Sequence, residues 1–261
     1  MKGIALGQFF PADTVIHRLD PRTKLLGTIL YIVALFCAKS AASYVIVAAL
    51  LAICCMLSCV RFGVLLRSIR PILIIILFTA FLNIFYTSGD VIAKFWVFSV
   101  TRQGVYRAIS MALRITMLVM GTFLLTYTTS PMDITDALEM LLRPLKKIGV
   151  PVHELSMMMC IALRFIPTLM NETTKLISAQ KARGADFESG NLFRRAKAMV
   201  PILVPLFISA FRRADDLATA MESRCYNGGE GRTKMKQFVL TTADYAAFCV
   251  CIVTLVLTIV V

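Results

Sequence analysis

Long apolar runs fill the two ends of the chain, and a charged, proline-punctuated stretch separates them. A helix needs about 20 mostly apolar residues to cross the ~30 Å hydrocarbon core of a bilayer. Five runs approach this length: 25–38, 44–60, 71–86, 104–127 and 238–261. The first run is short and is expected to recruit its flanking residues. The pattern predicts an all-α, polytopic membrane protein, with about four transmembrane helices in residues 1–128 and one in residues 238–261.

The charged stretch, residues 129–237, predicts three amphipathic helical pieces. The first has a helix start signal, with Ser130 as N-cap, Pro131 at the first helical position and Asp133 in the first turn. Apolar residues then recur at steps of four and three, at Ile134, Leu138, Leu141, Leu145 and Ile148. The piece is expected to end at Gly149, because glycine readily closes a helix.

The second piece begins near His153 and is expected to kink at Pro167, and the third follows Pro201 and Pro205. The second piece carries on one side Leu163, Ile166, Leu169, Met170, Thr173, Leu176 and Ile177. The third places on one stripe Leu206, Ala210, Ala214, Leu217 and Met221. Alanines at this spacing let two helices approach closely, so we expect the two pieces to pack against or cross each other.

Composition and charge agree with a bilayer protein. Hydrophobic residues make up 58% of the 261 residues, and the mean hydropathy is +0.78. The net charge is +13: the N-terminal segment holds 4 basic residues, the loop 61–70 holds 3 and residues 129–237 hold 16, whereas the other side holds Lys39, Lys94 and Arg102. The positive-inside bias therefore places the N-terminus and residues 129–237 in the cytoplasm and the C-terminus outside the cytoplasmic membrane.

Several function classes do not fit the residues present. No aromatic-rich basic groove or nucleic-acid module accompanies the charge, so nucleic-acid binding is not expected. The cysteines in the apolar runs lack Cys-x-x-Cys spacing and the two histidines, His17 and His153, lie far apart, so no metal site is expected. The glycine-rich segment 228–233 lacks the lysine and spacing of a phosphate-binding loop, so the chain is not expected to bind ATP itself.

Two of the helical pieces end in an arginine between small residues. These ends are Ala182-Arg183-Gly184 and Ser223-Arg224-Cys225, and their arginines are 41 residues apart. One interpretation is a cation that satisfies the last carbonyls and the helix dipole, with Gly184 as a left-handed cap. The other is a planar guanidinium that projects into a partner's carboxylate, a task for which arginine suits better than lysine. The repetition of the arrangement favours docking.

Five segments occur in an order and topology that resemble a known family. They are His17-Arg18-Leu19-Asp20-Pro21-Arg22-Thr23-Lys24-Leu25, Thr129-Ser130-Pro131, Leu163-Arg164-Phe165-Ile166-Pro167, Ala179-Gln180-Lys181-Ala182-Arg183-Gly184-Ala185 and Ala220-Met221-Glu222-Ser223-Arg224-Cys225-Tyr226. The chain resembles the transmembrane T component of energy-coupling factor (ECF) transporters, importers of vitamins and metal ions, over nearly its whole length. One departure is Cys225, where the family's second arginine motif usually has glycine.

The resemblance implies a scaffold that has no catalytic residues and no cofactor, because ATP is bound by two ABC-type ATPase partners. By motif match, these ATPases would dock on Arg183 and Arg224 with their neighbours Ala182, Gly184, Ser223 and Cys225. Two crossing coupling helices would cradle a small membrane-embedded, substrate-binding S component through Leu138, Leu141, Leu163, Ile166, Met170, Leu206, Ala210 and Ala214. Closure of the ATPases would then move the coupling helices and reorient the S component.

Two alternatives stay open. The chain would be the dedicated T component of one cobalt, nickel or biotin importer if it served a single S component, and the substrate pocket that decides this would lie in another chain. From a different class, a membrane-bound enzyme would use as acid and base Glu139, His153, Glu154 or Glu172. These side chains lack clustered spacing, which favours the scaffold. The sequence also leaves open whether Arg114, deep in the fourth apolar run, faces lipid or protein.

Overall fold

The computed structural model describes residues 9–10, 12–60, 62–87, 90–95, 98–187, 191–229, 231 and 238–261. It divides into two compact units. The first unit is formed by Met1–Leu141 together with Lys236–Val261, and the second by Leu142–Met235. The first unit contains, in chain order, α1 (Val15–Arg18), α2 (Pro21–Cys37), α3 (Ala41–Ser58), α4 (Phe62–Ile69), the 3-10 turn η1 (Arg70–Ile72), α5 (Leu73–Tyr86), α6 (Arg102–Thr128), α7 (Pro131–Leu142) and α10 (Thr242–Val260). The second contains η2 (Arg143–Ile148), α8 (Val152–Ala182) and α9 (Leu192–Glu222). The predominance of helix confirms the all-α prediction.

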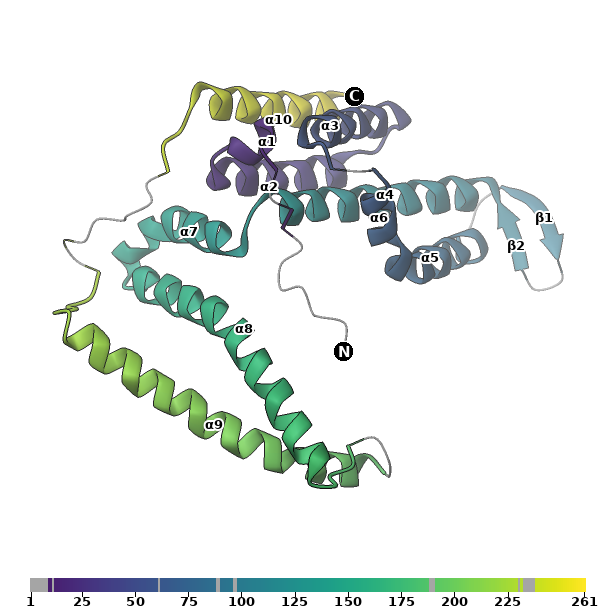
Figure 1. Ribbon diagram of the computed structural model, residues 1–261. Coiled ribbons are helices and arrows are strands. Elements are labelled where there is room, and N and C mark those ends of the chain that lie inside the picture. The colour runs from purple at the N-terminus through teal and green to yellow at the C-terminus, as the bar shows by residue number, and fades with distance from the viewer. Residues whose placement is uncertain are drawn as a thin grey trace. The chain divides into compact units, whose positions relative to one another are not determined.

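The core of the first unit is a bundle in which α2 packs against α10 and α6, and α3 packs against α10 (Figure 1). Leu35 of α2, Val47 of α3 and Leu65 of α4 are completely buried within it. Tyr31 also lies in this core and donates its hydroxyl to the Met117 carbonyl at 2.9 Å, which satisfies its polar end. Other apolar side chains of these helices are exposed, among them Ile29 of α2 and Val45 and Ile53 of α3.

Five helices of the described chain are long and apolar enough to cross a membrane: α3, the stretch Gly63–Tyr86 that includes α4 and α5, α6, α8 and α10. The predicted number is confirmed, but the membership differs by one helix. α2 recruits its N-terminal flank as expected, yet its 17 residues reach only about 26 Å. By length and composition alone α8 also qualifies, because its first half, up to Pro167, is apolar.

Hydrogen bonds at both ends of the bundle fix the direction of its helices. The backbone N–H of Asp20, before α2, donates to Asp244 Oδ1 in the first turn of α10 at 2.8 Å. At the other end, Ser43 in the first turn of α3 donates to the carbonyl of Thr258 near the end of α10 at 3.5 Å. The segment that precedes α2 and the C-terminal end of the chain therefore lie at opposite ends of this bundle.

Arg114 of α6 faces protein, which settles the question that the sequence left open. Its guanidinium donates to the Ala38 carbonyl at 2.9 Å and to the Tyr44 hydroxyl at 2.7 Å. It also lies 5.9 Å from the ring centroid of Phe36, so the cation is shared between hydrogen bonds and aromatic faces. Arg114 thus ties α6 to the turn between α2 and α3.

A short antiparallel hairpin, β1 (Val91–Phe95) and β2 (Phe98–Thr101), joins α5 to α6 (Figure 1). The sequence analysis did not predict it, because the apolar runs on either side dominate the pattern. The hairpin leads directly into α6, where Thr101 acts as N-cap and its side chain accepts from the Gly104 N–H at 3.1 Å.

The helix signals in residues 129–237 are confirmed at the first piece and corrected at the third. Ser130 Oγ accepts from the Asp133 N–H at 3.1 Å, and Gly149 closes η2 in a left-handed conformation. α9, however, begins at Leu192 and continues through Pro201 and Pro205 rather than starting after them. Each proline removes only one backbone bond, and the helical turns on either side hold the segment together. The second unit starts at Leu142, the last residue of α7.

Candidate functional site

The first arginine end closes α8 by backbone hydrogen bonds. The Ala185 N–H donates to the Gln180 carbonyl at 3.0 Å, and the Gly184 N–H donates to the Lys181 carbonyl at 3.0 Å. Gly184 has φ +85°, so this is a Schellman closure with glycine in the left-handed position. Arg183 is the C-cap residue, directly before that glycine.

The second arginine end, after α9, has the same closure. The Tyr226 N–H donates to the Met221 carbonyl at 3.1 Å, and the Cys225 N–H donates to the Glu222 carbonyl at 2.8 Å. Cys225 takes the left-handed position with φ 56°, which a residue other than glycine seldom adopts. Arg224 therefore stands in the same place relative to its helix as Arg183, despite the missing glycine.

The six residues of the two arginine ends are all exposed: Ala182, Arg183, Gly184, Ser223, Arg224 and Cys225. Backbone N–H groups satisfy the last carbonyls of both helices, so the guanidinium groups are not needed for capping. Within the described part of the chain, neither guanidinium makes a hydrogen bond or an ion pair. Both arginines therefore present an exposed guanidinium at the end of their helix.

α8 and α9 contact each other through an ion pair between Glu172 Oε2 and Arg213 Nη2 at 3.0 Å. Arg183 follows Glu172 by 11 residues, and Arg224 follows Arg213 by 11 residues. The two helices run in opposite directions, so the arginines lie at opposite ends of the pair (Figure 1). At 1.5 Å per residue each arginine is about 16 Å along its helix from the shared contact. The α8–α9 pair therefore carries one arginine at each end, at equal distances from the ion pair.

The residues predicted to contact an S component are not gathered into one buried patch. Leu138 and Leu141 belong to the first unit, where both are half-buried. In the second unit the structure leaves half-buried Leu163, Ile166, Leu206 and Ala210, and exposed Met170 and Ala214. The most exposed apolar stripe of α9 lies beside the predicted one, at Val200, Val204, Phe207 and Phe211, with Phe211 68% exposed. Steps of four, three and four mark this stripe in the sequence.

Residues 17–24, the N-terminal clasp, form a second candidate element that sequence reasoning did not assign a role. Lys24 Nζ donates to the carbonyls of His17 at 3.1 Å and of Thr128 at 3.0 Å. Arg22 Nη2 donates to the Phe238 carbonyl at 3.2 Å. Thr128 is the last residue of α6, where the chain leaves the bundle, and Phe238 lies just before α10, where it returns. The clasp is therefore bonded both to the end of α6 and to the segment that precedes α10.

Further hydrogen bonds fix the conformation of the clasp, within it and to the residues that precede it. Asp20 is buried, and its Oδ1 accepts from the Arg22 N–H at 2.8 Å. His17 is joined through Nδ1 to the Thr14 hydroxyl at 2.7 Å and through Nε2 to the Phe10 carbonyl at 3.1 Å. Partial burial and the nearby Lys24 cation lower the pKa of His17, which favours the neutral ring.

Of the residues named in the enzyme alternative, Glu172 is paired with Arg213 at 3.0 Å. Over the described residues, no three side chains of His, Cys, Asp or Glu type come together in a way that could hold a metal ion. Three thiols are exposed, those of Cys59, Cys225 and Cys249.

Comparison with known proteins identifies the family. A family model described as "Cobalt transport protein" matches residues 12–235. The energy-coupling factor transporter transmembrane protein EcfT of Thermosediminibacter oceani is 54% identical over 248 residues, which cover 95% of this chain and 94% of the relative. The chain belongs to the family of energy-coupling factor transporter transmembrane proteins. The EcfT of Bacillus subtilis is 47% identical over 245 residues, covering 94% and 92% of the two chains.

For this member of the EcfT family, the matched span includes the clasp and both arginine ends. The resemblance drawn from the sequence motifs is thereby confirmed. The structure adds that the two arginine motifs share one backbone geometry, and that the motif of residues 17–24 joins the start of α2 to the end of α6 and the approach to α10.

Proposed function

We propose that this chain is the scaffold of an ECF-type importer and couples ATP hydrolysis by two ABC-type ATPases to movement of a separate substrate-binding S component. The observation that carries the proposal is the identical closure at the two arginine ends, each with an exposed guanidinium that makes no bond to the described chain. A guanidinium fork pairs well with a carboxylate in a partner's groove. Two arginine ends of the same geometry, at opposite ends of one helix pair, could each bind one of two similar ATPase subunits.

The exposed stripe of α9 and the predicted faces of α7 and α8 would cradle the S component. Phe207 and Phe211 are more than half exposed, and exposed apolar surface of this extent indicates an interaction site. The chain itself would bind no cofactor and no nucleic acid, because ATP would be held by the partner subunits. Its other environment would be the lipid of the cytoplasmic membrane.

The excess of lysine and arginine in the clasp and in residues 129–237 supports a cytoplasmic location for both. In this orientation the clasp lies at the cytoplasmic end of the bundle. Its bonds to Thr128 and Phe238 would anchor the two ends of residues 129–237, the proposed coupling region, so that a force applied at Arg183 or Arg224 moves helices rather than unfolding the bundle.

Charge reversal at both arginines tests the proposal. Burying like charges together costs several kcal/mol, so Arg183→Glu with Arg224→Glu should abolish ATPase retention on affinity purification and abolish uptake. Either single change should be milder, because two contacts on one scaffold act as a bivalent link. Arg212→Glu, an exposed arginine within α9, is the matched control and should retain both activities. Normal ATPase retention by the double variant would refute docking at these ends.

The description of the matching family model names cobalt transport, which favours a second candidate, a T component dedicated to one metal importer. The two candidates differ in the number of S components that the chain accepts. Purification of the tagged chain from its own cells should yield one kind of S component if it is dedicated and several kinds if it is shared. Uptake of radioactive cobalt by the reconstituted complex then tests the metal directly.

A further inference from the structure

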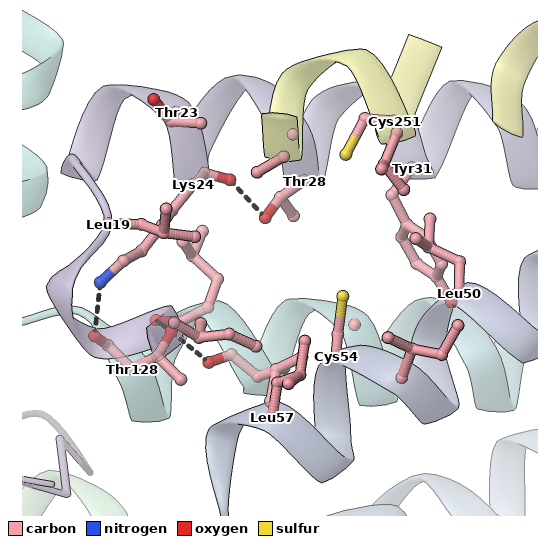
Figure 2. A pocket seen from close by; sticks show the side chains of 18 of the residues that line it. Leu19, Thr23, Lys24, Thr28, Tyr31, Leu50, Cys54, Leu57, Thr128 and Cys251 are labelled. Atoms are coloured by element: carbon pink, nitrogen blue, oxygen red, sulfur yellow. Dashed lines mark hydrogen bonds between the residues drawn. The ribbon is translucent and has the colours of Figure 1, made fainter. Parts of the chain in front are cut away.

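A cavity of about 340 Å³ lies inside the first unit, between α1, α2, α3, α6 and α10. Leu19 and Thr128 lie at one end, and Tyr31 and Leu50 lie at the other (Figure 2). All of its lining belongs to the bundle, so the cavity is separate from the arginine ends and from the exposed stripe of α9.

The cavity presents hydrocarbon, because the polar side chains that line it are turned to the backbone. Thr28 Oγ1 donates to the Lys24 carbonyl at 2.8 Å, and Thr128 Oγ1 donates to the Leu124 carbonyl at 2.8 Å. Tyr31 donates to the Met117 carbonyl at 2.9 Å. Water needs two to four polar partners to occupy a cavity, and apolar cavities of about 150 Å³ are known to stay dry and to accept apolar ligands. A cavity more than twice that volume calls for an apolar occupant.

The length of the cavity indicates which apolar molecule fits. Its lining on α2 runs from Thr23 to Tyr31, nine residues whose eight helical rises span about 12 Å. One leaflet of the hydrocarbon core is about 15 Å thick, half of the whole core. The cavity therefore accommodates most of one acyl chain from a single leaflet, and it is too short for a group that crosses both leaflets.

The cavity opens to lipid and carries a cation at one end. Three side chains of its lining are more than half exposed, Val15, Ile53 and Val250, so a chain can enter from the side. Lys24 lines the end next to Leu19 and Thr128, with its ammonium group held among backbone carbonyls (Figure 2). A phosphate headgroup at this end would meet positive charge.

We propose that this cavity is a phospholipid site: one acyl chain of a glycerophospholipid from the leaflet next to α1 fills it, with the headgroup phosphate beside Lys24. The lipid completes the packing between α2, α3 and α10 and is retained when the bulk lipid is removed.

Native mass spectrometry of the full chain, purified in detergent after lipid depletion, tests the proposal. The wild type should retain one glycerophospholipid per chain. Cys54→Phe fills the cavity, because the Cys54 thiol projects into it (Figure 2), and should reduce the retained fraction at least tenfold. Val45→Phe, at an exposed position on the same helix that does not line the cavity, is the matched control and should retain lipid like the wild type. Equal retention by Cys54→Phe, or none by the wild type, would overturn the proposal.

A second measurement needs no variant, which matters if Cys54→Phe fails to fold. Wild-type chain is reconstituted with phosphatidylglycerol that carries a photoreactive diazirine in one acyl chain, and the cross-linked peptides are sequenced. The lipid should attach to cavity residues, including Leu50, Cys54 and Cys251. Attachment only to outward-facing positions such as Val45 and Val253 would mean that the cavity holds no lipid.

Discussion

The Lys24 ammonium nitrogen lies 3.0 Å from the carbonyl oxygen of Thr128, the last residue of α6 and 104 residues further along the chain. The same ammonium group lies 3.1 Å from the His17 carbonyl, so one cation joins the segment before α2 to the end of α6, where the chain leaves the bundle. In the sequence analysis Lys24 contributes only to the charge that predicts membrane orientation. In the structure it also connects two segments of the bundle.

Lys24→Met should weaken this junction while keeping the length and apolar stem of the side chain. Hydrogen bonds that involve a charged group contribute about 1.5–3 kcal/mol each, so the variant should unfold at a clearly lower temperature than the wild type in a thermal-shift assay. It should also transport less substrate per ATP hydrolysed, because one anchor of the coupling region is lost. Lys39→Met, an exposed lysine at the other end of α2, is the control, and an equal effect there would discount the clasp.

Cys225 occupies a left-handed position that glycine adopts without steric cost. Cys225→Gly should therefore stabilise the end of α9 by up to about 1 kcal/mol, whereas the β-branched Cys225→Val should destabilise it by about 1–2 kcal/mol. ATPase retention should be preserved in Cys225→Gly, since Arg224 keeps its place. Hydrogen exchange of the amides of residues 219–226 measures the local stability, and no difference between the two variants would show that Cys225 is not held left-handed.

The Glu172–Arg213 ion pair sets where α8 and α9 meet, so it should influence both arginine ends at once. Its side chains are partly exposed to solvent, which screens the charges, so breaking the pair should change the overall stability little. Arg213→Glu places like charges at the contact and should reduce ATPase retention, and addition of Glu172→Arg should restore it by re-forming the pair in reverse. A double variant that binds no better than Arg213→Glu alone would show that the contact does not position the helices.

His17 should make the clasp sensitive to acid. Because the pKa of His17 is lowered in the folded chain, the unfolded chain takes up the proton first as the pH falls through its ordinary value near 6.5. Stability contributed by the neutral ring is present above that pH and is lost below it. As the pH is lowered from about 8 to about 5.5, the unfolding temperature of the wild type should decrease, and that of His17→Gln should decrease less. If the unfolding temperatures of the wild type and His17→Gln change equally with pH, His17 is not the cause of the acid sensitivity.

Short-range signals explain how much of the fold was predictable. The Ser130 N-cap, the Gly149 stop and the left-handed Gly184 are decided by residues within one or two turns, and each is found as expected. Local patterns fail at α9, because they predict a helix that starts after Pro201 and Pro205, whereas the helix continues through both prolines. They were also silent about the hairpin between α5 and α6.

The sequence by itself determined the class of protein, the approximate spans, the family and the two arginine motifs, because apolar runs and helix-end residues act within a few residues of chain. Only the tertiary structure decided that Arg114 faces the turn between α2 and α3 and that Lys24 reaches Thr128. The reason is physical: these contacts, and the cavity beside Lys24, exist only when helices far apart in the chain pack together, and no periodicity within one helix specifies its neighbour.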